Sequence, residues 1–125
     1  MPRRSSVWAL RGLLCLNLLI LLGGCERTAP VPDAATIAAL RPDNPHLSEI
    51  YATACMACHT MPDSGAPQTG MVSQWQPRLA KGMPTLLQNV VQGLNGMPAG
   101  GQCFACTTAD YEALIRFMSQ PPAAP

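Results

Sequence analysis

The chain has 125 residues, of which only 12% are charged, and its formal net charge is +1. Without residues 1–24, five basic residues stand against seven acidic ones, which leaves a net charge of −2. No basic cluster is present, so we do not expect the protein to bind nucleic acid through its phosphates.

The first 24 residues have the pattern of an export signal. Arg3, Arg4 and Arg11 precede an apolar run at residues 13–22. The run is shorter than the about 20 apolar residues that cross a bilayer, but it fits the about 7–15 residues of a signal peptide's apolar part. We therefore expect residues 1–24 to be a signal peptide. The arginine pair matches a twin-arginine signal poorly, so export as an unfolded chain is expected.

The segment Leu22-Gly23-Gly24-Cys25 at the end of this run resembles a bacterial lipobox. The resemblance implies cleavage before Cys25, followed by acylation of its thiol and of the new amino terminus. Several acyl chains together give stable anchoring to a membrane. The alternative is that Cys25 merely follows a signal cleaved at small residues. Glu26, rather than aspartate, is the next residue, which leaves sorting to the inner or the outer membrane open.

Residues 25–43 are rich in proline, alanine and threonine, and we expect them to form a lipidated flexible tether in which a short helix at residues 34–40 can form. A folded domain is predicted at residues 44–119, and residues 120–125 are predicted to be a disordered tail. The expected location is the bacterial cell envelope, where the lipid would hold the domain in the periplasm.

Helical spacing of apolar residues predicts an all-α domain with three main helices and no sheet. The first helix begins at Asn44 and Pro45, which suit the cap and the first turn, and should end near Cys55. Proline and glycine interrupt residues 61–82, so we expect loops there and at most one short helix at residues 75–79. A second helix is predicted at residues 84–92.

After the first helix, the last helix is the one that the sequence indicates best. Thr107 and Asp110 have the spacing of a capping box. Apolar residues then recur at helical spacing and form a stripe of Tyr111, Leu114, Ile115 and Met118.

The sequence Cys55-Met56-Ala57-Cys58-His59 indicates the main chemistry. Two thiols three positions apart, followed directly by histidine, are the attachment pattern of c-type haem. Cys55 and Cys58 would form thioethers with the haem vinyl groups, and His59 would bind the iron. One covalently attached haem c per chain is therefore predicted.

Cys103 and Cys106 form a second pair with the same spacing. In an oxidising compartment we expect them to form a disulfide. The four paired cysteines also have the spacing of a structural zinc site. Export and the unused His59 argue against zinc. A thiol–disulfide oxidoreductase is disfavoured because the chain lacks a βαβ pattern.

Taken together, four groups of residues resemble class I c-type cytochromes and, among these, the cytochrome c-five family. The resemblance covers residues 48–119. Its motifs are Tyr51-x3-Cys55-x2-Cys58-His59, Gly65-Ala66-Pro67, Trp75-x-Pro77-Arg78-x2-Lys81-Gly82-Met83 and Gly96-Met97-Pro98-x2-Gly101-x-Cys103-x2-Cys106. The second cysteine pair after Met-Pro is the specific part. The chain departs from the family at Ala99 and at Gln68-Thr69.

The resemblance implies that Met97 is the second axial iron ligand, opposite His59. The spacing agrees, because Met97 lies 38 residues after His59 in a segment rich in glycine and proline. Met71 and Met83 remain alternatives. Each can equally fill the core, as methionine often does.

The resemblance also assigns three residues to the surroundings of the haem. The carbonyl of Pro67 would accept the second ring N–H of His59. Trp75 and Arg78 correspond to positions near the haem propionates, although plain core packing is the alternative for Trp75, whose buried indole needs a partner for its N–H. Tyr51 is assigned to packing between the first and last helices.

We expect an electron carrier rather than an enzyme. With His59 and Met97 both bound, no coordination position is left for a substrate, and a methionine ligand raises the reduction potential. The expected partners are redox proteins of a respiratory chain, either an oxidase or a reductase. The alternative function is a haem enzyme or gas-binding sensor whose sixth coordination position is open.

Overall fold

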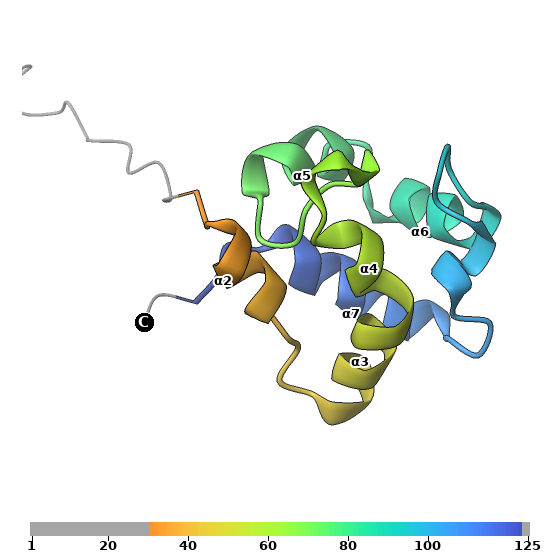
Figure 1. The fold of residues 1–125 in the computed structure, drawn as a ribbon. Coiled ribbons are helices and arrows are strands. Elements are labelled where there is room, and N and C mark those ends of the chain that lie inside the picture. Colours follow the sequence, from red (N-terminus) through yellow and green to blue (C-terminus); the bar gives the residue numbers. More distant parts are fainter. Residues whose placement is uncertain (1–30, 124–125) are drawn as a thin grey trace, which may run out of the picture.

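The structure, a computed structural model, describes residues 31–123, and Figure 1 shows them as short helices joined by loops. The described part contains no strand, and its only bridge pairs Leu94 with Met97. The predicted all-α class is therefore confirmed. None of the helices from residue 31 to residue 123 has the length and apolar character needed to cross a membrane. The predicted signal peptide and the lipid site at Cys25 lie outside the described residues.

The first long helical stretch consists of α3 (Pro45–Ile50), the π-helical turn η1 (Tyr51–Cys55) and α4 (Met56–His59). The side chain of Asn44 caps α3 by accepting a hydrogen bond from the Leu47 N–H at 3.1 Å, as predicted. The wider turn is closed by the Met56 N–H, which donates to the Tyr51 carbonyl. The helix therefore continues past Cys55, where its end was expected, and holds His59 in its last turn.

The middle of the chain contains more helix than its prolines and glycines suggested. A single 3-10 turn, η2 (Pro62–Ser64), precedes α5 (Val72–Leu79), which begins three residues before the predicted short helix. The predicted second helix is α6 (Met83–Gln92). Gly82 and Gly93 flank α6 with φ values of 83° and 84°, which favour glycine. A further 3-10 turn, η3 (Ala99–Gln102), follows.

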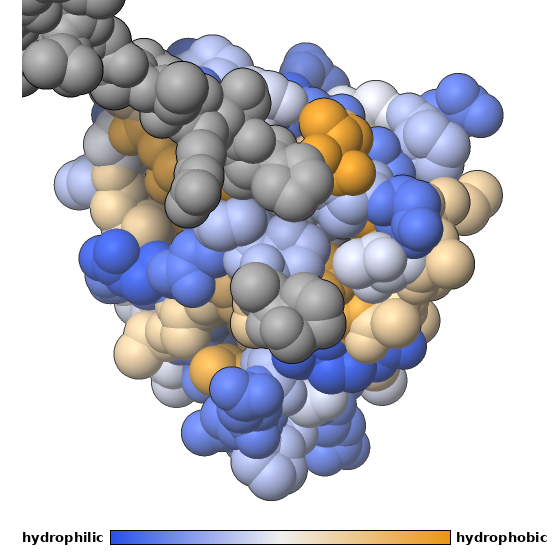
Figure 2. All heavy atoms as spheres, turned by 90° about the vertical axis from the view of Figure 1, so that its left-hand side faces the viewer, coloured by the Kyte–Doolittle hydropathy of each residue, from blue (hydrophilic) through white to orange (hydrophobic). Residues whose placement is uncertain are grey.

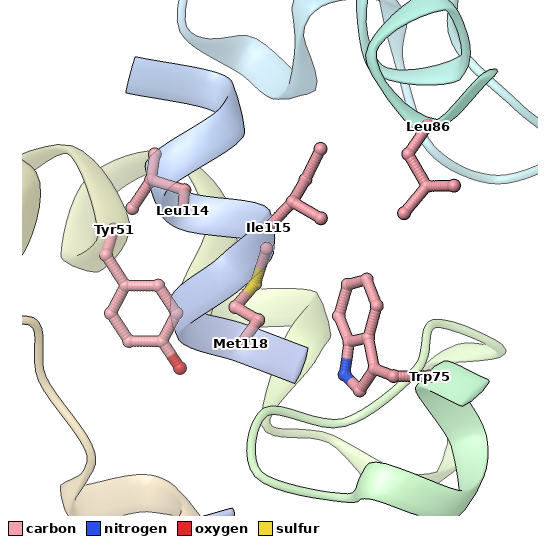
Figure 3. Packing of buried hydrophobic residues seen from close by; sticks show 6 residues of the cluster. All are labelled: Tyr51, Trp75, Leu86, Leu114, Ile115 and Met118. Atoms are coloured by element: carbon pink, nitrogen blue, oxygen red, sulfur yellow. The ribbon is translucent and has the colours of Figure 1, made fainter. Parts of the chain in front are cut away.

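The final helix α7 (Thr108–Ser119) contributes three of the six residues of the buried core cluster. Its predicted capping box is present, because Thr107 and Asp110 each bond to the other's backbone N–H. Figure 3 shows Leu114, Ile115 and Met118 pointing from α7 toward side chains of η1, α5 and α6. Tyr51 of η1 is fully buried, and its ring and that of Phe117 form a T-shaped pair with a centroid distance of 5.1 Å. The expected packing role of Tyr51 agrees with these contacts.

Both ends of the described chain fold onto one loop, which corrects the predicted limits of the domain. Helix α2 (Ala34–Ala39) buries Ile37 to 2% exposure. A Cβ built on Gly70 would lie 3.1 Å from Leu40 Cδ1 and 3.3 Å from Pro122, so these side chains close over the loop. Residues 34–42 are thus part of the folded unit rather than of a flexible tether. Pro122 likewise lies within a segment that was predicted to be disordered, and the burial of apolar side chains explains both differences.

The face at the left of Figure 1, where α2 lies, is shown in Figure 2. Strongly hydrophobic residues appear there as small separate patches between hydrophilic ones. Isolated apolar side chains are normal on a protein surface. We therefore assign no binding function to the described residues that are visible on this face.

Replacing Thr107 with alanine should lower the free energy of unfolding by about 1 kcal/mol, because α7 loses its N-terminal cap. Chemical denaturation of the haem-loaded protein measures this loss. Thr108→Ala is the control, since the Thr108 side chain forms no hydrogen bond within residues 31–123. Equal stability of the two variants would contradict the capping role.

Candidate haem site

A cavity of about 490 Å³ lies between α4, α5, α6, α7 and the loop at residues 94–103. Its volume falls within the about 300–1,000 Å³ typical of pockets for small molecules and cofactors. Figure 3 shows Ile115, Leu86 and Trp75 pointing into the space between their helices. The cavity also brings together the four residues predicted to attach or ligate haem, namely Cys55, Cys58, His59 and Met97.

The two attachment cysteines differ in exposure because η1 and α4 place them at different depths. Cys55 is half-buried and packs against the core, whereas Cys58 is exposed at the rim. Burial raises the pKa of the Cys55 thiol to about 11, so it stays protonated at neutral pH. Both sulfur atoms belong to residues that line the same cavity, as attachment to one haem requires.

The loop that follows η2 fixes the orientation of the His59 ring through a hydrogen bond. Its Nδ1 atom lies 2.7 Å from the carbonyl oxygen of Pro67. A carbonyl can only accept, so Nδ1 carries the proton and Nε2 is left free to coordinate a metal. Burial lowers the pKa of His59, and the charge of Arg78 adds to the effect, although the bond to Pro67 opposes it. A neutral ring is the form that binds metal.

Trp75 lines the cavity, but its N–H is already used. The Nε1 atom donates to the carbonyl of Gln68 at 2.8 Å, and the side chain is only 4% exposed. The suggested contact of this indole N–H with a haem propionate is therefore replaced by a bond to the backbone. The ring also stacks on His59 at a centroid distance of 5.8 Å and an angle of 20°. Trp75 thus supports the histidine from the side of α5.

Arg78 lies one helical turn after Gln74 and also lines the cavity. Its Nη1 atom donates to the backbone carbonyl of Gln74. The structure therefore places Arg78 beside the site, as predicted, and fixes one of its nitrogens to the chain. A role toward a propionate stays a prediction.

Met97 is the candidate second ligand that the structure places at the cavity; the alternatives Met71 and Met83 do not line it. A small antiparallel bridge holds Met97 in place, because its N–H and carbonyl bond to Leu94 at 3.0 Å each. Met118 also lines the cavity, but its side chain is only 4% exposed and belongs to the core cluster that contains Trp75. Met97 is therefore the methionine best placed for a ligand.

The second cysteine pair stabilises the far side of the cavity. Cys103 and Cys106 are joined by a disulfide in the structure, with 5.4 Å between their Cα atoms. The hydroxyl of Tyr111 donates to the carbonyls of Gly100 and Cys103, at 3.1 and 2.7 Å. The sequence predicted Tyr111 only as part of an apolar stripe. The periodicity of apolar residues does not reveal that the Tyr111 hydroxyl bonds to the loop at residues 94–103.

The zinc alternative does not fit this arrangement. Between residues 31 and 123, no three histidine, cysteine or acidic side chains lie close enough to hold a metal ion. Haem does fit, because the cavity offers two thiols, a free imidazole nitrogen and a thioether beside apolar walls. Cys55, Cys58 and His59 would hold the group.

Residues 42–118 match the family model described as cytochrome C oxidase, cbb3-type, subunit III. The chain is 37% identical to cytochrome c5 of Azotobacter vinelandii, over 57% of its own length and 88% of that protein. It resembles a mono-heme ferrocytochrome c from Shewanella putrefaciens with a TM-score of 0.53 and 42% identity, covering 74% of this chain and 99% of that one.

A further solved structure describes an electron transfer complex of nitrite reductase with cytochrome c. The chain matches it with a TM-score of 0.53 and 33% identity, over 61% of its own length and 93% of the matched chain. The family model covers more than half of the chain, and the homologues of this family bind covalently attached haem c. The chain therefore belongs to the family of that model and is a class I c-type cytochrome with covalently attached haem.

Proposed function

We propose that this electron-transfer cytochrome carries single electrons with His59 and Met97 as the two axial ligands of its iron. The observation that carries the proposal is that one cavity is lined by the two attachment cysteines, by His59 from α4 and by Met97 from a separate loop. When bound, the haem supplies exchange of one electron between ferric and ferrous iron. The chain supplies both ligands and keeps small molecules from the iron.

The loop that carries Met97 depends on a close approach to the end of α6. A Cβ built on Gly93 would lie 2.9 Å from the Met97 carbonyl oxygen and 3.0 Å from the Ala99 nitrogen. A Cβ on Gly101 would lie 3.3 Å from Met97 Cε. Glycine at both positions therefore lets the backbone fold tightly around the methionine, which supports a fixed ligand rather than a mobile side chain.

The location and the partners belong to the same proposal. The apolar run and Cys25 in the sequence support a lipid-anchored protein of the bacterial cell envelope, with the domain in the periplasm. An oxidising compartment also suits the pair Cys103 and Cys106 as a disulfide. As partners we propose redox proteins of a respiratory chain. A similar cytochrome is described in an electron transfer complex with nitrite reductase, which supports a reductase among them.

Met97→Ala should leave the haem covalently attached but remove the weak long-wavelength absorption band of sulfur bound to ferric iron. The reduction potential should fall and the reduced protein should bind carbon monoxide, because a coordination position opens. Absorption spectra and redox titration measure both effects. Met83→Ala is the control, since Met83 packs against the core without lining the cavity.

Carbon monoxide binding by the reduced wild type would contradict the proposed ligation. It would instead support the alternative of a haem enzyme or gas-binding sensor with an open sixth position.

Gly93→Ala should weaken or abolish the same absorption band, because the added methyl group collides with the backbone that holds Met97. Gly82→Ala is a closely matched control. Gly82 and Gly93 have nearly the same backbone angles, with φ/ψ of 83°/150° and 84°/155°. Alanine at either position therefore introduces a similar backbone strain of about 1–3 kcal/mol. The Cβ at Gly82 meets only Pro84 Cδ, at an ordinary 3.7 Å. An equal effect of both substitutions on the band would rule out a specific role of Gly93.

A further inference from the structure

The loop that positions His59 contains a peptide group with hydrogen bonds on both of its sides. The carbonyl of Pro67 accepts from His59 Nδ1 at 2.7 Å. The N–H of the same peptide group belongs to Gln68, and it donates to Oε1 of Gln74 at 2.8 Å. Because a backbone N–H can only donate, the atom of Gln74 that faces it must be the amide oxygen. One continuous chain of donors thus runs from His59 to Gln74.

Hydrogen bonds arranged in such a chain strengthen one another. An acceptor at the N–H of an amide polarises the group and makes its carbonyl oxygen a better acceptor. Gln74 therefore strengthens the bond between Pro67 and His59. A stronger acceptor at Nδ1 makes the imidazole more basic at its other nitrogen, the one that binds metal.

We propose that Gln74 is a positioning residue for His59, which acts through the Pro67–Gln68 peptide group and lowers the reduction potential of the bound iron. The proposal rests on the function proposed above, in that His59 is taken as an axial ligand. A more basic histidine stabilises ferric iron more than ferrous iron, so the sign of the effect follows. Gln74 is a half-buried residue in the first turn of α5, and its amide reaches the peptide group from outside the cavity lining.

The loop does not depend on Gln74 alone for its shape. The Thr69 N–H donates to the His59 carbonyl at 2.7 Å, and the Thr69 hydroxyl bonds to the Tyr51 hydroxyl at 2.8 Å. The Gly70 N–H donates to the Met118 carbonyl at 2.8 Å. The Gln68 side chain adds a bond to the Thr60 carbonyl at 3.1 Å. Removal of the Gln74 amide should therefore leave the loop folded and change mainly the polarisation of one peptide group.

The test compares Gln74→Leu with Gln76→Leu in the haem-loaded protein. Gln76 lies on the same helix, is exposed, and its side chain forms no hydrogen bond within the described residues. At a fixed solution potential, the ratio of ferrous to ferric protein should rise about twofold to fivefold in Gln74→Leu, as expected for the loss of a fraction of one hydrogen bond's free energy. It should stay unchanged in Gln76→Leu.

A second measurement separates polarisation from a merely structural role. The proton on His59 Nδ1, observed by NMR in the diamagnetic ferrous protein, should resonate at higher field in Gln74→Leu, because its hydrogen bond is weaker. Gln74→Glu keeps an acceptor and strengthens it, so both readouts should move in the opposite direction. Gln76→Glu controls for the added charge.

Equal ratios in the two leucine variants, together with an unmoved Nδ1 proton, would overturn the role of Gln74. Failure of the proposed Met97 ligation looks different, because the sulfur-to-iron band would then be missing from the wild type itself, before any substitution at Gln74. If Gln74→Leu does not fold, Gln74→Glu against Gln76→Glu decides the question, and equal shifts in that pair would likewise overturn the proposal.

Discussion

The hydrogen bond from His59 Nδ1 to the Pro67 carbonyl, 2.7 Å long, is the constraint on which the site depends. It fixes the tautomer of the ring and aims the other nitrogen into the cavity. The two residues come from different elements, since α4 carries His59 and a loop after η2 carries Pro67. Other contacts keep α4 and this loop in fixed positions relative to each other.

That relative position is maintained by buried polar side chains, one bonded to the backbone and one to another side chain. Trp75 donates to the Gln68 carbonyl, and the Tyr51 hydroxyl bonds to Thr69, which is fully buried. In the described part of the chain, no fully buried side-chain nitrogen or oxygen lacks a partner. An unpaired buried group would cost about 1–3 kcal/mol, so these bonds specify the loop as well as stabilise it. Leu40 and Pro122 then close over the same loop.

The other side of the cavity is organised by different means. A short bridge between Leu94 and Met97, the bonds of Tyr111 and the disulfide hold a loop with few side chains of its own to bury. Helix α7 connects the two sides, because Leu114, Ile115 and Met118 all line the cavity as well as the core. A single helix thus carries both the packing of the fold and one wall of the site.

The sequence by itself determined the chemistry and most of the helices. The Cys55–His59 spacing, the Thr107 capping box and the periodicity of α6 and α7 are local features, which neighbours in sequence decide. Only the tertiary structure decided the features that depend on residues distant in sequence. It showed the π-helical turn through which the helix continues to His59, and the packing of α2 on the domain. It also showed the hydrogen bond from Trp75 to Gln68, and that Met71 and Met83 do not line the cavity. Burial and hydrogen-bond partners at these points come from other elements, so no local pattern can encode them.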